Sequence, residues 1–127
     1  MVAARSSCLT PPAGARSGSV SSITRFAEPC PPGPAVRGWL HRPPQPSGDG
    51  LVLAHGAGSN ADAPILVAMA EGMAEAGWTV LRCDLPFRQE RPTGPPHRGA
   101  GERDRAGLRN AATALRALAS GRLVLGG

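Results

Sequence analysis

LVLAHGAGSN, residues 51–60, is the stretch that indicates the fold most directly. Its first four residues are apolar without alternation, which is typical of a strand that is buried on both faces of a sheet. A His and then two Gly separated by one Ala follow this run. Glycine is used where the chain needs a positive φ or where another group must approach the backbone closely. The stretch therefore predicts a buried strand over 51–54 that breaks off into a turn.

A helix is predicted after this turn. Pro64 suits a first helical position, and Asp62 can accept backbone N–H bonds near the helix start. Gly77 is placed to end the helix in the left-handed conformation. Thr79–Cys83 then reads as a second buried strand, with Cys83 as a small buried hydrophobe. The apolar positions of the helix recur at helical spacing, at Leu66, Met69, Ala70 and Met73.

The same order of elements continues after the second buried strand. Residues 86–101 hold four Pro and three Gly, and we predict one long loop there. A second helix is expected to end at Gly121, and residues 123–125 start a third buried strand. The apolar positions of this second helix are Leu108, Ala111, Ala112, Leu115 and Leu118. Buried strands joined by helices favour a parallel α/β sheet with right-handed crossovers.

The carboxyl ends of such parallel strands meet at one edge of the sheet, where ligands bind. We therefore expect residues 55–60, 84–91 and 126–127 to lie at that edge. Before them, residues 20–27 and 36–40 have weak strand character, and the Pro-rich residues 28–34 read as a turn or linker.

Composition limits the classes of protein and of site. All 14 basic residues are Arg, they are scattered, and only four aromatics accompany them, so we expect no nucleic-acid partner. A GC-rich bacterial coding sequence explains the Arg content. Three Cys without a CxxC pair indicate neither a disulfide framework nor a zinc site, and we expect no metal or cofactor. No apolar run reaches the ~18 residues of a membrane span, so a cytoplasmic location is expected.

The domain organisation follows from the placement of apolar residues. Only 23 of the 127 residues are Leu, Val, Ile or Phe, and few of them lie in the first thirty. Residues 1–19 are basic and Ser-rich, and we expect a disordered or targeting-like extension. Residues 20–127 are then expected to form one unit.

Dinucleotide binding is the first chemistry that the turn could serve. Gly56, Gly58 and Ala61 satisfy G-x-G-x-x-G/A after a strand, and Asp84 ends the next strand, where an acidic residue would bind the ribose of NAD(P). That motif normally runs directly into its helix. Here residues 60–63 intervene and Pro64 starts the helix late, which counts against this interpretation.

Acyl transfer is the second chemistry. In α/β-hydrolases a turn after the third strand presents a backbone N–H to the oxyanion. Ala57 would be this donor, while Gly56 and Gly58 would allow the bend and the approach of a substrate carbonyl. His55 would be a structural residue beside the turn, and Asp84 would lie near the site.

Residues 51–91 resemble the amino-terminal half of a small α/β-hydrolase family. The family includes bacterial dienelactone-hydrolase-like proteins, a testis-expressed vertebrate protein and a regulatory subunit of a histone acetyltransferase complex. Its HGAG turn is followed by a D-x-P-[FY]-x-x-x-x-R-like segment, which residues 84–91, DLPFRQER, fit. The resemblance implies ester, thioester or lactone hydrolysis through a serine nucleophile, on a small ester-like substrate. It also allows a non-catalytic scaffold role.

The chain departs from this family in one respect. No G-x-S-x-G elbow occurs in the 127 residues. In the family, the fifth strand continues into G-[KH]-S-x-G-G, so Gly127 would be the first Gly and the nucleophile would be residue 129. We therefore expect an incomplete α/β-hydrolase fold, truncated after the fifth strand and inactive by itself.

The remaining polar residues have simpler interpretations. Ser59 reads as a backbone-bonding turn residue, His97 as a solvent-exposed loop residue, and His41 has no visible partner. Four charged residues could either line a cleft or form local ion pairs in a solvated loop. They are Asp84, Arg88, Glu90 and Arg91.

Overall fold

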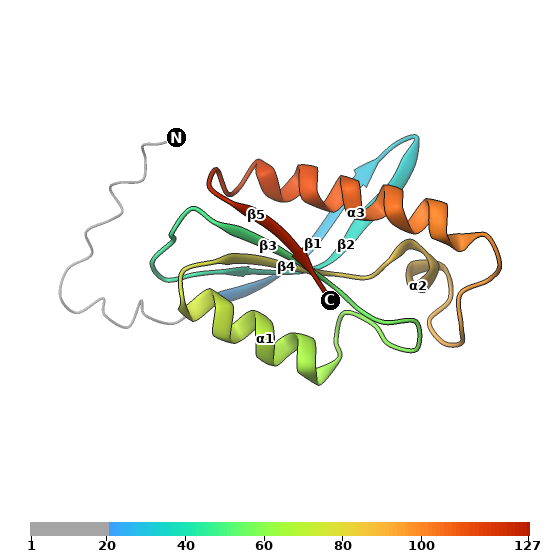
Figure 1. Ribbon diagram of the computed structural model, residues 1–127, viewed down its shortest axis with the longest axis horizontal. Coiled ribbons are helices and arrows are strands. Elements are labelled where there is room, and N and C mark those ends of the chain that lie inside the picture. Colours follow the sequence, from blue (N-terminus) through green and yellow to red (C-terminus); the bar gives the residue numbers. More distant parts are fainter. Residues whose placement is uncertain (1–20) are drawn as a thin grey trace.

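The computed structural model describes residues 21–127 as a five-stranded sheet with helices on both faces (Figure 1). The extension predicted over residues 1–19 lies outside the described residues. The strands are β1 (Ser22–Cys30), β2 (Gly33–Arg42), β3 (Gly50–Ala54), β4 (Thr79–Cys83) and β5 (Leu123–Gly126). The helices are α1 (Pro64–Glu75), α2 (Pro86–Glu90) and α3 (Ala100–Arg116). In Figure 1, α3 covers one face of the sheet and α1 the other.

The strands are ordered β1-β2-β4-β3-β5. β3 pairs parallel with both β4 and β5, whereas β2 pairs antiparallel with β4, and β1 with β2. This arrangement confirms the predicted fold class, a mostly parallel α/β sheet that is preceded by two antiparallel strands. The prediction of a third buried strand was wrong, because β5 lies at the edge of the sheet and its Val124 and Leu125 are 43% and 49% exposed. Because helices cover both faces of β3, its residues are apolar without alternation.

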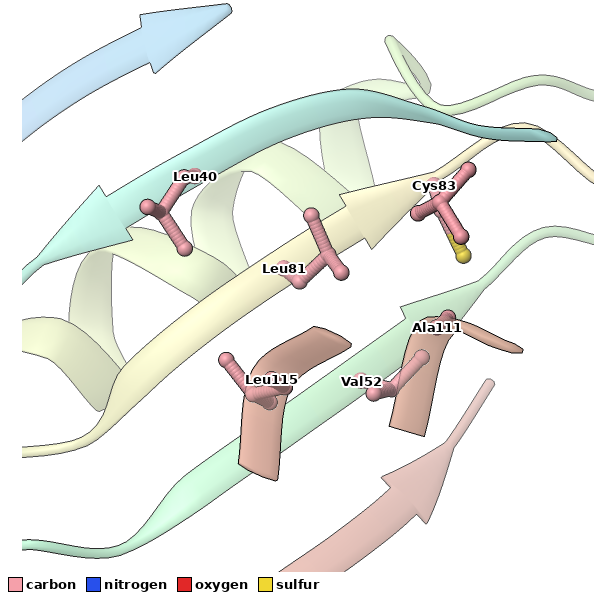
Figure 2. Packing of buried hydrophobic residues seen from close by; sticks show 7 residues of the cluster. Leu40, Val52, Leu81, Cys83, Ala111 and Leu115 are labelled. Atoms are coloured by element: carbon pink, nitrogen blue, oxygen red, sulfur yellow. The ribbon is translucent and has the colours of Figure 1, made fainter. Parts of the chain in front are cut away.

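The register of β3 and β4 sorts their side chains between two clusters. Val52 pairs with Leu81 and faces α3, where Leu115 completes a cluster shown in Figure 2. Leu51 pairs with Val80 on the α1 side. Each fully buried Leu stabilises the fold by about 2 kcal/mol. The α3-side cluster is Val36, Leu40, Val52, Leu81, Cys83, Ala111 and Leu115. The α1-side cluster is Leu51, Leu53, Leu66, Ala70 and Val80.

α1 follows its prediction at both ends except for the cap. Pro64 is its first residue, and Gly77 ends it with a φ of 106°. The prediction for Asp62 was wrong, because no side chain caps this helix. The Asp62 carboxylate instead lies 3.7 Å from Nη1 of Arg82, whose buried charge attracts it.

The loop predicted over 86–101 is shorter than expected. Pro86 starts α2, since it suits a first helical position, and Phe87 holds this short helix by burying its ring. α3 begins at Ala100, which leaves residues 91–99 as the loop. A Cβ at Gly107 would lie 2.6 Å from Cγ of Pro86, so only glycine lets α3 pack against α2 this closely.

α3 also ends earlier than predicted, at Arg116 rather than at Gly121. The Arg116 guanidinium donates to the carbonyls of Ala119 and Gly121. These bonds favour the earlier stop, because they fold the chain back beyond the helix end. As a result, Leu118 lies outside the helix and is 42% exposed.

The hairpin of β1 and β2 is longer than the sequence predicts. The turn or linker expected over 28–34 is confined to Pro31 and Pro32. Residues on both sides of this tip belong to the strands, because Glu28 pairs with Val36 across the hairpin.

Candidate active site

The carboxyl edge of the sheet brings together the three segments that were expected there. β3 runs into the loop 55–63, and β4 runs into the segment 84–91. Leu53 on β3 pairs with Gly126 on β5, so the end of β5 lies beside the start of the loop. Figure 1 shows the loop after β3 and helix α2 at the same end of the sheet.

His55 has both ring nitrogens occupied by backbone groups. Its Nε2 accepts the N–H of Leu85 at 3.0 Å, and its Nδ1 lies 2.8 Å from the carbonyl oxygen of Gly56. A carbonyl can only accept, so the ring proton is on Nδ1. The side chain is fully buried, and its ring meets that of Phe87 edge-on, with centroids 5.6 Å apart. His55 therefore ties the loop to the segment after β4 and has no nitrogen free for proton transfer.

Residues 56–58 form the exposed tip of the turn. The carbonyl of Gly56 accepts the N–H of Ser59 at 3.1 Å, which closes the turn. Within residues 21–127, the N–H of Ala57 has no hydrogen-bond acceptor. Gly56 and Gly58 both have ordinary φ, and a Cβ added to either would meet no atom within 4 Å. The space beside these glycines is therefore open to a ligand.

Arg88 lies beneath this tip and is 6% exposed. Its Nη2 donates to the carbonyl of Ala57 at 2.9 Å, and its Nε donates to the carbonyl of Ser59 at 2.8 Å. Its Nη1 donates to the carbonyl of Arg91, where α2 ends. The guanidinium therefore links two carbonyls of the turn to the segment after β4, and does not form the local ion pair considered above.

Ala61, at the far end of the turn, is held through both its N–H and its carbonyl. The Asp84 carboxylate accepts its N–H at 2.8 Å, and Arg82 Nη1 donates to its carbonyl at 2.6 Å. The Arg82 Nε in turn donates to Nε2 of His41 at 2.8 Å. β4 and the segment that follows it thus fix the whole course of the loop between His55 and Ala61.

The other two histidines do not reach the turn. His41 is fully buried beside Arg82, and within the described part of the chain its Nδ1 has no partner. Burial, and then the charge of Arg82, lower the pKa of His41 to about 4. His97 is exposed in the loop 91–99. Glu90, near the end of α2, pairs with Arg103 at 3.2 Å instead of lining the turn.

Sequence reasoning missed Arg82 and Arg88 as the residues that hold the loop. One signal was present for Arg82, because it interrupts the apolar run of a buried strand. A charged residue at such a position must find partners. Arg88 gave no comparable signal, since the sequence predicted a loop where α2 buries it.

Residues 21–127 hold no group of three or more His, Cys, Asp or Glu that could bind a metal ion. None of the helices in this range has the length and apolarity that a membrane span requires.

Three comparisons with known proteins bear on this geometry. The family model of the alpha/beta hydrolase domain matches residues 48–127. Alpha/beta hydrolase GrgF from Penicillium sp. sh18 matches with a TM-score of 0.60 and 24% identity, over 84% of this chain and 37% of its own. XC6422 from Xanthomonas campestris, a serine hydrolase without a lid, matches with a TM-score of 0.58 and 19% identity, over 85% of this chain and 50% of its own. A search of curated proteins found no significant match.

The family match favours the hydrolase interpretation of the turn over dinucleotide binding. One oxygen of the Asp84 carboxylate accepts the Ala61 N–H, so Asp84 holds the loop in a way that needs no bound ribose. The chain spans 37% and 50% of the two solved hydrolases, whose likeness supports the fold. The family model covers more than half of the chain, and the chain therefore belongs to the alpha/beta hydrolase domain family.

Proposed function

We propose that the loop 55–63 supplies one half of the oxyanion hole of a serine hydrolase, with the Ala57 N–H as donor. The observation that carries this proposal is that Ala57 is exposed and its N–H has no acceptor within residues 21–127. It follows strand β3, the position from which hydrolases of this fold present their first oxyanion donor. The parent reaction would be hydrolysis of an ester, thioester or lactone through an acyl-serine.

The chemistry of this donor follows from how the turn is held. As a nucleophile adds to the substrate carbonyl, negative charge develops on the oxygen, and a fixed N–H then stabilises it. Such a preorganised donor is worth about 3–4 kcal/mol of transition-state stabilisation. The open space beside Gly56 and Gly58 would admit the carbonyl. His55 would position the turn, because both of its ring nitrogens are already bonded.

No nucleophile, acid or base is assigned among these residues. Ser59 contributes its backbone N–H and carbonyl to the turn, and no G-x-S-x-G occurs. The finer resemblance to dienelactone-hydrolase-like proteins belongs to this proposal and rests on the HGAG turn and the DLPF segment. A small ester-like substrate and a cytoplasmic location remain predictions.

The donor can be tested without catalysis. Methylphosphonate is a small tetrahedral oxyanion, and the purified chain can be titrated with it while amide NMR signals are followed. We expect a saturable downfield shift of the Ala57 amide proton, and no shift with sodium chloride at equal ionic strength. An Ala57 amide that responds alike to both salts contradicts the proposal.

Catalysis by the 127 residues alone is not expected. The purified chain, incubated with p-nitrophenyl acetate, should release p-nitrophenol no faster than a heat-treated control. Faster release that a serine-reactive phosphonate abolishes would show that these residues contain a nucleophile after all. A reading frame that continues past codon 127 into [KH]-S-x-G-G would supply the missing serine.

A further inference from the structure

The geometry points to a second donor in the same turn: we infer that Arg88 is a positioning residue that holds the Ala57 carbonyl and so turns the Gly58 N–H away from the guanidinium, as a second free donor of the exposed tip beside that of Ala57. This inference rests on the proposed oxyanion role of the turn. It adds to that role a two-donor site for a small oxyanion, and it assigns a function to a buried guanidinium.

The direction of the Ala57 N–H follows from its own peptide group. In a trans peptide the C=O and the N–H point in opposite directions. Pro31-Pro32 is the only cis peptide bond within residues 21–127. The carbonyl of Gly56 points toward Nδ1 of His55. The N–H of Ala57, in the same peptide, therefore points away from Nδ1 of His55, and Ala57 itself is exposed.

The same argument applies to the next peptide. The carbonyl of Ala57 points toward Nη2 of Arg88 at 2.9 Å, so the N–H of Gly58 points away from the guanidinium. Gly58 is exposed, and its N–H has no acceptor within the described range 21–127. His55 thus directs one donor and Arg88 directs the next one along the chain.

An arginine suits this task better than a lysine would. Its guanidinium is planar and presents several donors in a fixed fork. Here Nη2 donates to the carbonyl of Ala57 and Nε donates to the carbonyl of Ser59. These carbonyls lie on either side of Gly58 in the chain, so one planar guanidinium holds both of them. A Lys at this position would keep the charge but lose the fork.

The charge of Arg88 adds to this effect. Buried charges are normally paired, yet within residues 21–127 no carboxylate forms an ion pair with Arg88. Its partners are backbone carbonyls, and the carbon of the guanidinium lies 4.8 Å from the centre of the Phe87 ring. A cation without a counter-charge lies directly beneath the turn, so its field favours an anion on the open side.

The test compares the amide signals of Ala57 and Gly58 in the full chain during titration with methylphosphonate. In the wild type both amide protons should shift downfield with one shared Kd. In Arg88→Met the Gly58 response should be lost and the Kd should rise about ten- to a hundred-fold, as for one lost hydrogen bond to a charged group. Arg88→Lys should lie between the two, because it keeps the charge. Arg105→Gln, an exposed residue of α3, should match the wild type.

Each outcome separates this inference from the proposed function. If neither amide responds in the wild type, the proposed oxyanion role fails. If Ala57 responds and Gly58 does not, only the second donor is refuted. If both respond equally in the wild type and in Arg88→Met, Arg88 does not position Gly58. If Arg88→Met and Arg88→Lys both fail to fold, or if their Kd values stay constant while Tm falls, Arg88 is structural only and the inference is wrong.

Discussion

Two loops of the molecule are held very differently: the loop 55–63 follows β3 at the carboxyl edge of the sheet, and the loop 91–99 joins α2 to α3. The loop 55–63 is tied down by the side chains of His55, Arg82, Asp84 and Arg88. The loop 91–99 is almost entirely exposed, and its own side-chain bonds are local, such as that of His97 to the carbonyl of Arg98. Both are rich in Gly or Pro. Side-chain bonds to the backbone, and not composition, therefore distinguish the held loop, residues 55–63, from the loose loop, residues 91–99.

The largest expected effect comes from Arg82, which is buried and holds the loop 55–63. Arg82→Met removes the donor to the Ala61 carbonyl and leaves the accepting nitrogen of His41 unpaired. We expect a loss of about 3 kcal/mol in the free energy of unfolding, because several charge-assisted bonds are lost at a buried position. Urea denaturation measures it. Arg98→Ala in the loose loop should cost less than about 0.5 kcal/mol; equal losses would remove the contrast between the loops.

The second-largest effect is expected from acid, which should lower the free energy of unfolding through His41. The pKa of His41 is lowered to about 4 in the folded protein from 6.5. The unfolded chain therefore takes up this proton first as the pH falls. Stability from the neutral ring is complete above pH 6.5 and is lost progressively between 6.5 and 4. The loss is at most about 3 kcal/mol.

Thermal unfolding across this pH range measures the effect of His41. The exposed His97 provides the matched control, since His97→Gln should leave the pH profile of Tm unchanged. A Tm that stays flat between pH 6.5 and 4 in the wild type would show that His41 is not held neutral in the fold.

Asp84 should give a smaller effect with a clear chemical signature. Asp84→Ala removes the acceptor of the Ala61 N–H, and we expect a loss of about 1.5 kcal/mol. Asp84→Asn should recover most of it, because its carbonyl oxygen can still accept. Urea denaturation of both variants decides this. If Asn is as damaging as Ala, the negative charge matters more than the hydrogen bond does.

The smallest effect is expected where the chain is loosely held. Two Gly inserted after Gly94 lengthen the loose loop, and the added closure entropy costs only about 0.2 kcal/mol, since even doubling a loop costs about 0.6 kcal/mol. The same insertion after Gly58 should cost several times more, since it displaces the carbonyls that Arg88 holds. Equal costs at the two sites, measured by urea denaturation, would contradict the comparison.

The sequence predicted the elements whose cause is local or periodic. The apolar run from Leu51 identified a strand that is buried on both faces, and Pro64 and Gly77 marked the ends of α1. Helix α2 was missed, because five residues rich in polar side chains carry no period. The burial of Phe87 stabilises α2, and this burial depends on tertiary packing.

The site was predictable only in part, for the same physical reason. The HGAG turn and Asp84 were singled out because strand ends of a parallel sheet converge. What Asp84, Arg82 and Arg88 bond to could not be read from the sequence. Each of them reaches a backbone group more than twenty residues away, in a loop whose path the sequence does not specify.

Backbone 15N relaxation of the two loops tests most directly whether the turn is held in place before any ligand binds. Residues 56–60 are largely exposed, yet we predict order parameters near 0.85, as in rigid backbone, because side chains hold their carbonyls. Residues 92–98, equally exposed, should fall below about 0.6. Order parameters for residues 56–60 as low as those for 92–98 would contradict a preorganised donor turn.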